Sequence, residues 1–193
     1  LFNEETFGQF KHWAYLWTLL DGTSYCDENT RHLGNTYRRA LEGIETDSSI
    51  EKQAFHIADD AFAEPVGLYY GKTYFGEEAK RDVIALTKEI IAMDKKRIKS
   101  RSFLSRKTKA KAILKLDSMA IKMGYPEKIE ALYDQLSVAE DASLYEALGT
   151  LEKQKNTYAF SELFTPVDHR RWTMAGDEVN ACYESSSNDI SFP

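Results

Sequence analysis

The spacing of apolar residues predicts a mainly helical chain that ends in a short β segment. Apolar side chains recur three and four positions apart along most of the sequence, which is the period of a helix with one buried face. We expect helices over residues 4–20, 27–42, 48–69, 76–100, 105–123 and 142–160. Residues 127–141 are less regular and predict a helical turn or two.

Capping residues and prolines refine this pattern. Asn3 precedes the first helix as an N-cap, and Pro65 predicts a kink or break near Ala63, because proline disfavours helical backbone in the residue before it. The apolar faces are expected to be buried, as aromatic stripes on helices usually belong to a core. The expected buried residues are Phe7, Phe10, Trp13, Trp17 and Leu20 in the first helix, Val83, Leu86, Ile90 and Met93 in the fourth, and Ile113, Leu116, Ala120 and Met123 in the fifth.

The last residues carry the only good strand signal in the sequence. Two short alternating runs flank the polar stretch 184–188, which predicts a β-hairpin over 178–192. Because a two-stranded hairpin is marginally stable in water, we expect the other strands of its sheet to lie outside these residues. The chain is therefore expected to be part of a longer polypeptide, to expose apolar surface and to self-associate through the open strand edge.

Composition and charge narrow the class of protein. The 193 residues are 42% hydrophobic, which is enough for a packed core, and no apolar run approaches the ~20 residues of a membrane helix. Two cysteines, Cys26 and Cys182, predict no disulfide framework and favour a reducing, cytoplasmic location. Residues 95–115 hold ten basic residues and no acid. Such a block can bind nucleic acid, but the solvated surface of a helix is the favoured interpretation, with neither nucleic acid nor membrane as partner.

The residues themselves show no catalytic centre. None of His12, His32, His56 and His169 belongs to a His-Glu-x-x-His helix, and His56 with Asp59 and Asp60 lacks a further ligand for a metal. Glu64 lies in an apolar run, so a partly buried carboxylate is expected there, with a structural salt bridge favoured over a functional site. We therefore expect no catalytic residue and no metal ligand in this chain.

Several motifs, in order along the chain, resemble those of the neprilysin-like zinc metallopeptidases, especially the oligopeptidases of lactic acid bacteria. The resemblance covers most of the chain, and the motifs together are specific although each alone is weak. They are the run AFAEPVGLYYGKTYFGEEAK at 61–80, LSRKTKAKA at 104–112 with Lys115-Leu116, KMGYP at 122–126, and the tail at 172–193.

The resemblance implies a fold and a function. Members are largely helical zinc endopeptidases with two lobes around a cavity, and they cut short peptides. Residues 1–165 would be a segment of the helical cap lobe, and 166–193 the crossing to the catalytic domain. In the family, the Val-Asn-Ala-x-Tyr segment is an edge strand beside the zinc that holds the substrate, so the resemblance implies that Asn180 and Ala181 are the candidate substrate-binding residues.

The zinc-binding motif of the family matches no position in this sequence. Zinc is thus expected in the longer parent protein, whose catalytic portion would be the partner of this chain, with none bound here and no activity of the chain alone. The alternative is a helical module that binds peptides without cleaving them, and a nucleic-acid-binding domain is the weakest alternative.

Overall fold

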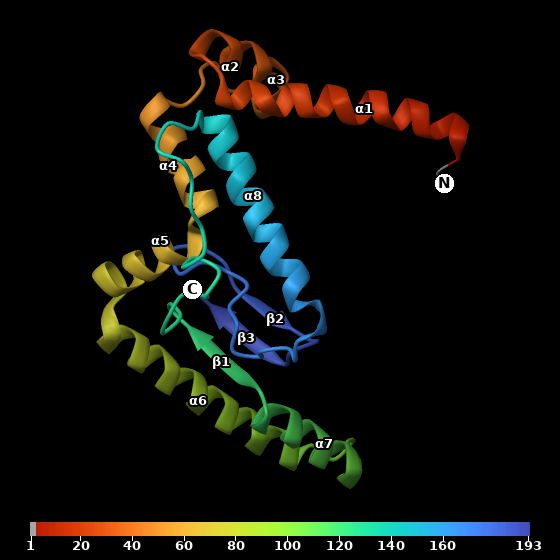
Figure 1. Cartoon of the computed structure of the whole chain (residues 1–193). Helices are drawn as coiled ribbons and strands as arrows, with labels where there is room; N and C mark the ends of the chain where they lie inside the picture. Colours follow the sequence, from red (N-terminus) through yellow and green to blue (C-terminus); the bar gives the residue numbers. More distant parts are fainter. Residues whose placement is uncertain (1–2) are drawn as a thin grey trace. The chain divides into compact units, whose positions relative to one another are not determined.

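The computed structural model describes residues 3–193, apart from the side chain of Glu5 (Figure 1). The chain divides into two compact units, Leu1–Ala61 with Ser137–Asn156, and Phe62–Leu136 with Thr157–Pro193. The boundary between them falls once within helix α8 (Leu144–Ser161). The expected mainly helical fold with a small C-terminal β segment is confirmed.

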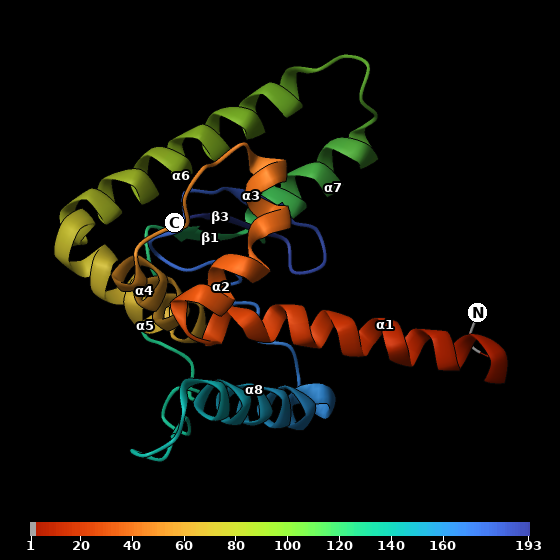
Figure 2. The ribbon, with the colours of Figure 1, turned by 90° about the horizontal axis from the view of Figure 1, so that it is seen from above.

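The first unit is built from helices. It contains α1 (Glu4–Gly22), a 3-10 turn (Thr23–Tyr25), α2 (Glu28–Gly34), α3 (Thr36–Glu42), α4 (Ile50–Ala61) and the first part of α8. At the start of α1, the Asn3 side chain accepts a hydrogen bond from the Thr6 amide at 2.8 Å, which completes a capping box. Figure 2 shows α1 extending away from α2 and α3.

The helix predicted over 27–42 is two helices. Asn35 separates α2 from α3 with a ψ of 0°, outside the ordinary helical range. Its side-chain amide donates to Asp47 Oδ1 at 3.0 Å, and the same carboxylate accepts from Arg39 at 2.6 Å. The two short helices are therefore arranged around the Asp47 carboxylate, a tertiary contact that helical spacing does not reveal.

The aromatic stripe of α1 is not buried, so that prediction is wrong for the described chain. Its five side chains are between 40% and 56% exposed; they are Phe7, Phe10, Trp13, Trp17 and Leu20. Trp13 lies 5.7 Å from Phe10 and 6.1 Å from Trp17 between ring centroids. The rings contact one another along the helix, while the other described segments cover the stripe only in part.

The helices of the second unit begin where the sequence pattern predicts, although not all of them end there. It contains α5 (Ala63–Tyr70), a π-helical turn (Gly71–Phe75), α6 (Gly76–Ser100), α7 (Arg106–Asp117) and a 3-10 turn (Glu162–Phe164). The predicted break before Pro65 is confirmed at Phe62, which leaves the helical conformation. Pro65 then lies in the first turn of α5, where its missing N–H costs no helical hydrogen bond.

The buried face of α6 differs from the predicted one. Ile91 and Lys80 are buried, whereas Leu86, Ile90 and Met93 are at least half exposed. The inward face is set by strand β1, as the Thr87 hydroxyl near Met123 illustrates. The basic block 95–115 forms mostly exposed surface of α6 and α7, where Lys95 pairs with Asp117.

A three-stranded sheet contains the hairpin, and its third strand comes from within the chain. The strands are β1 (Ala120–Met123), β2 (Cys182–Glu184) and β3 (Asp189–Phe192), in the order β1-β3-β2. The hairpin of β2 and β3 is antiparallel, as predicted, and β3 runs parallel to β1.

Two predictions are corrected by β1. The helix that was expected to reach residue 123 ends at Asp117. The hairpin was expected to find its other strands outside these residues, but β1 of this chain supplies one of them. Backbone pairing with β3 accounts for both, since the Ala120 N–H donates to Asn188 at 3.0 Å and the Gly124 N–H donates to Phe192 at 2.7 Å. Spacings of three and four residues in a short apolar run do not separate a helix from a helix followed by a strand.

The core of the second unit lies between the sheet and α6. Met123 and Tyr125 are buried there with the polar residues Lys122, Asp189 and Ser191. Residues 127–141 contain turns rather than a regular helix, such as the one closed by the Tyr133 N–H on Glu130 at 3.1 Å. Among residues 3–193, no helix combines the length and the apolar character needed to cross a bilayer.

Candidate functional site

The candidate substrate-binding residues lie at the open edge of the sheet. Strand β2 pairs with β3 on one side, and the sheet has no further strand on its other side among residues 3–193 (Figure 1). Asn180 and Ala181 directly precede β2 and are exposed, as is Val179 before them. An exposed strand edge presents backbone N–H and C=O groups to which an extended peptide can pair.

The Asn180 side chain is held by short-range hydrogen bonds. Its Nδ2 donates to Glu178 Oε1 at 2.8 Å, and its Oδ1 accepts from the Ala181 N–H at 2.8 Å. Both bonds are exposed to solvent, so they can be exchanged at little free-energy cost. The amide therefore offers a donor and an acceptor next to the strand edge.

The segment that leads into β2 packs closely on α5 through two glycines. A Cβ added to Gly67 would lie 2.3 Å from the Gly176 amide nitrogen, and one added to Gly176 would lie 2.7 Å from the Gly67 carbonyl oxygen. Both glycines are buried. The path of the backbone ahead of Asn180 thus depends on the absence of side chains at these two positions.

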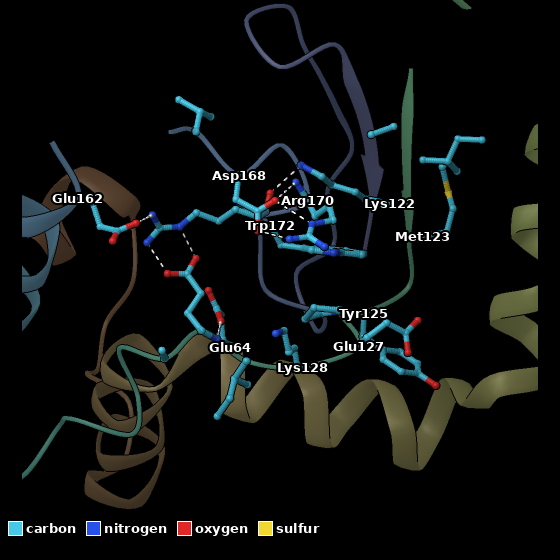
Figure 3. Close-up of a pocket in the computed structure, with 18 of the residues that line it drawn as sticks. Glu64, Lys122, Met123, Tyr125, Glu127, Lys128, Glu162, Asp168, Arg170 and Trp172 are labelled. Carbon is cyan, nitrogen blue, oxygen red and sulfur yellow. Dashed lines mark hydrogen bonds and ion pairs between the residues drawn. The ribbon is translucent and has the colours of Figure 1, made fainter. Parts of the chain in front are cut away.

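A cavity of about 670 Å³ lies in the same unit, on another part of its surface (Figure 3). It is formed by β1 and the turns after it, the C-terminal end of α8 and the segment 165–172. Apolar side chains such as Ile84, Pro126 and Trp172 line it together with charged ones. Neither Asn180 nor Ala181 is among the lining residues.

Arg171 pairs with two carboxylates at this cavity, and a third carboxylate, Glu64, lies close to them. Its guanidinium binds Glu130 through two nitrogens and lies 3.9 Å from Glu162. Glu64 accepts a hydrogen bond from the Glu130 backbone N–H at 2.9 Å. Burial, with the nearby charge of Glu130, raises the pKa of Glu64 above its usual value. The expected partly buried carboxylate is confirmed. Its hydrogen-bond partner is a backbone amide, whereas a charged side chain was expected.

Two buried lysines are also paired. Lys80 Nζ lies 2.7 Å from Glu127 and 4.3 Å from the centre of the Tyr125 ring. Lys122 Nζ lies 2.8 Å from Asp189. The Tyr125 hydroxyl donates a hydrogen bond to Glu77 at 2.6 Å. Burial, and in second place the Glu77 carboxylate, raises the pKa of Tyr125 to about 12. These charged groups are engaged with one another, so they organise the fold around the cavity.

The described residues do not fit a zinc site. In the part of the chain that the structure describes, no three His, Cys, Asp or Glu side chains gather closely enough to hold a metal ion. His56, the nearest candidate in the sequence, packs edge-on against Phe55 at 5.7 Å between ring centroids. Cys26 and Cys182 are both free thiols in the structure.

Comparison with known proteins identifies the family. The model of peptidase family M13 matches residues 1–126, well over half of the chain. The chain belongs to peptidase family M13. The expected resemblance to neprilysin-like peptidases is thereby confirmed, and proteins named neprilysin are among its relatives, including Neprilysin-2 of Drosophila melanogaster at 28% identity over 93% of this chain and 26% of that protein.

Bacterial M13 relatives match over the whole chain. The neutral endopeptidase of Lactobacillus helveticus is 38% identical over all 193 residues, which cover 30% of that protein. The crystal structure of PEPO from Lactobacillus rhamnosis superposes on the whole chain with a TM-score of 0.91 at 39% identity, over 30% of its length. The zinc metalloprotease ZMP1 of Mycobacterium tuberculosis, at 24% identity, shares the fold with a TM-score of 0.77 over 95% of this chain and 27% of its own. This M13 chain therefore spans about 30% of the length of the relatives it matches.

The structure shows further candidate residues that the sequence did not indicate. Lys122, Asp189 and Arg171 form buried or half-buried contacts around the sheet, and Gly67 meets Gly176 across a large sequence separation. Most of them fall within the motifs of the family resemblance, but no local pattern shows what they contact, because each depends on a partner far along the chain.

Proposed function

We propose that this chain is the part of an M13 zinc endopeptidase that binds the peptide substrate beside the zinc. The support is family membership together with the names of the relatives, which are neutral endopeptidases and a zinc metalloprotease. The observation that carries the proposal is the open edge of β2, directly preceded by the exposed Asn180 and Ala181.

A peptide would bind as an added strand along β2. Backbone N–H and C=O groups on the outer side of the strand would pair with the peptide backbone, which gives affinity for extended peptides of many sequences. Asn180 would exchange its bonds to Glu178 and the Ala181 amide for bonds to the peptide backbone. A folded protein cannot present such a free strand easily, so short peptides are the proposed substrates.

Zinc would be held by the remainder of the polypeptide, since the residues described here offer no ligand set for it. When bound, zinc activates a water molecule for attack on the peptide bond. The contribution of this chain is to bind and orient the peptide backbone, and its helices would wall the cavity in which the peptide lies.

The remaining proposals concern organisation and location. Residues 1–165 would form a cap-lobe segment and 166–193 the crossing to the catalytic domain, whose remaining portion is the proposed partner. The exposed apolar side chains of α1 are compatible with such a partner. Without it, we expect self-association through the β2 edge. A cytoplasmic location remains part of the proposal.

The test uses the full-length protein that contains this sequence and a short internally quenched peptide. We expect zinc-dependent cleavage, and we expect Asn180→Ala to reduce kcat/KM by about tenfold or more, as the loss of hydrogen bonds to a bound backbone predicts. Asn29→Ala is the matched control, because Asn29 is also exposed but lies in α2. Unchanged kcat/KM in the Asn180 variant would remove this residue from the site.

A second candidate function is a helical module that binds peptides without cleaving them. It is favoured by the combination of an open strand edge with no metal-ligand cluster in residues 3–193. Peptide binding measured by fluorescence anisotropy, without any cleavage by the full-length protein, would favour this function over the first.

A further inference from the structure

One buried ammonium group contacts both segments that flank the candidate edge strand. The Lys122 side chain is 5% exposed and lies on β1. Its Nζ donates to Asp189 Oδ2 at 2.8 Å and to the Arg171 backbone carbonyl at 2.6 Å. Asp189 belongs to β3, the strand beside β2, and Arg171 lies on the segment that leads into β2.

The contact with Asp189 reaches the hairpin itself. Asp189 pairs with Glu184 of β2 in the antiparallel register, and its carboxylate also accepts from the hydroxyls of Ser187 and Ser191. Ser187 lies in the turn between β2 and β3. Burial opposes ionisation of Asp189, but the hydrogen bonds from Lys122 and Ser187 hold its pKa below the usual value. A charged Asp189 thus connects β1, the hairpin turn and β3.

The contact with Arg171 restrains the segment ahead of β2. The carbonyl of Arg171 is held by Lys122, while its guanidinium is held by Glu130 and Glu162. Further along the same segment, Gly176 packs against Gly67. The backbone that leads to Asn180 is therefore held at two points, Arg171 and Gly176. Lys122 provides the hydrogen-bond donor at Arg171.

We propose that Lys122 is a positioning residue that sets the placement of the peptide-binding edge by holding Asp189 of β3 and the Arg171 carbonyl at once. This inference rests on the proposed function. Lys122 does not contact the peptide; it acts through the strand and the segment on either side of β2. Its loss is expected to weaken peptide binding even when the stability of the fold is restored.

Mutation can separate the contribution of Lys122 to stability, through its ion pair with Asp189, from its contribution to the placement of the strand edge. A buried ion pair can be replaced by apolar side chains of similar size with little loss of stability, whereas removal of one partner leaves an unpaired buried charge. The double variant Lys122→Met/Asp189→Leu therefore removes both charges together. It cannot restore a donor for the Arg171 carbonyl, which is left with one hydrogen bond fewer.

The experiment compares four variants of the full-length protein: Lys122→Met, Lys122→Met/Asp189→Leu, Lys122→Arg and Lys80→Met. Lys80 is the control, because it is as buried as Lys122, but its partners are the exposed carboxylate of Glu127 and the Tyr125 ring. The readouts are the melting temperature, kcat and KM for the quenched peptide, and hydrogen exchange of the backbone amides at 172–184.

We expect Lys122→Met to lower the melting temperature and raise KM. The double variant should recover part of the melting temperature, because it removes the unpaired charge but also the acceptor of the Ser187 and Ser191 hydroxyls. It should keep a KM about tenfold above that of the unaltered protein and faster amide exchange at 172–184. Lys122→Arg, which keeps a charged donor, should lie close to the unaltered protein in KM. Lys80→Met should lower the melting temperature with KM unchanged.

The proposal is overturned if the double variant recovers KM and exchange together with stability, or if Lys80→Met raises KM as much as Lys122→Met. The proposed function fails separately, if the unaltered protein does not cleave the peptide. Amide exchange then decides the positioning role by itself, since faster exchange in the double variant supports it and unchanged exchange rejects it.

Discussion

Helix α1 and the C-terminal sheet differ in how completely this chain packs them. Along α1, large apolar side chains such as Trp13 and Trp17 remain more than half exposed. Around the sheet, even the charged side chains of Lys122 and Asp189 are buried and paired. The sheet region therefore has its packing partners within the chain, whereas α1 presents an apolar surface of the kind that marks an interaction site.

The largest expected difference between the two regions comes from aromatic side chains. Tyr125→Ala should destabilise the 193-residue chain by about 3–5 kcal/mol, because a fully buried ring is replaced by a cavity and the bond to Glu77 is lost. Trp13→Ala should cost about 1 kcal/mol or less, since that ring is half exposed. Urea denaturation of both variants measures the difference. Equal losses would contradict the contrast between the regions.

Replacement of a glycine by alanine should change the stability of the two regions by smaller amounts and in opposite directions. Gly67→Ala should destabilise by about 1–3 kcal/mol, because its Cβ would overlap the Gly176 backbone. Gly8→Ala in α1 should stabilise by about 0.5–1 kcal/mol, since no atom lies within 4 Å of the added Cβ and alanine favours the helix. Thermal unfolding of the two variants checks the signs, and a stabilising Gly67→Ala would show that the segment around Gly176 is not packed on α5.

The smallest expected effect is the pH dependence of Glu64. Its pKa in the fold is raised above 4.5, so its ionisation costs stability as the pH rises from about 4.5 through the folded pKa. Glu64→Gln should therefore gain melting temperature relative to the unaltered chain over that range and then reach a plateau. Glu51→Gln should behave oppositely, because hydrogen bonds from its own backbone amide and from Ser49 lower the pKa of Glu51. A Glu64→Gln difference that does not change with pH would show that its carboxylate is solvated.

Much of the helical fold follows from local sequence. Capping by Asn3, the proline at position 65 and the helical period place α1, α4, α5, α6 and α8 close to their observed bounds. Which face is buried, and what covers it, does not follow, because both depend on partners elsewhere in the chain that periodicity does not show. The stripe of α1 and the inward face of α6 were both predicted wrongly for that reason.

Strand β1 shows the same limit at the level of secondary structure. Residues 120–123 fit the helical spacing of α7, but they pair with β3, which lies about 70 residues later in the sequence. The open edge of β2 was predictable from the hairpin pattern and the family resemblance. The roles of Lys122 and Arg171 were not, because the motif at 122–126 does not show what Lys122 contacts, and Arg171 acts partly through its backbone carbonyl.

The central claim is that the outer edge of β2 binds a peptide strand. A crystal structure of the full-length protein with a bound peptide inhibitor tests it most directly. The account predicts an extended peptide backbone paired along β2, with the Asn180 amide hydrogen-bonded to it. A peptide bound elsewhere, for example in the cavity lined by Trp172 and Pro126, with the β2 edge unpaired, would contradict it.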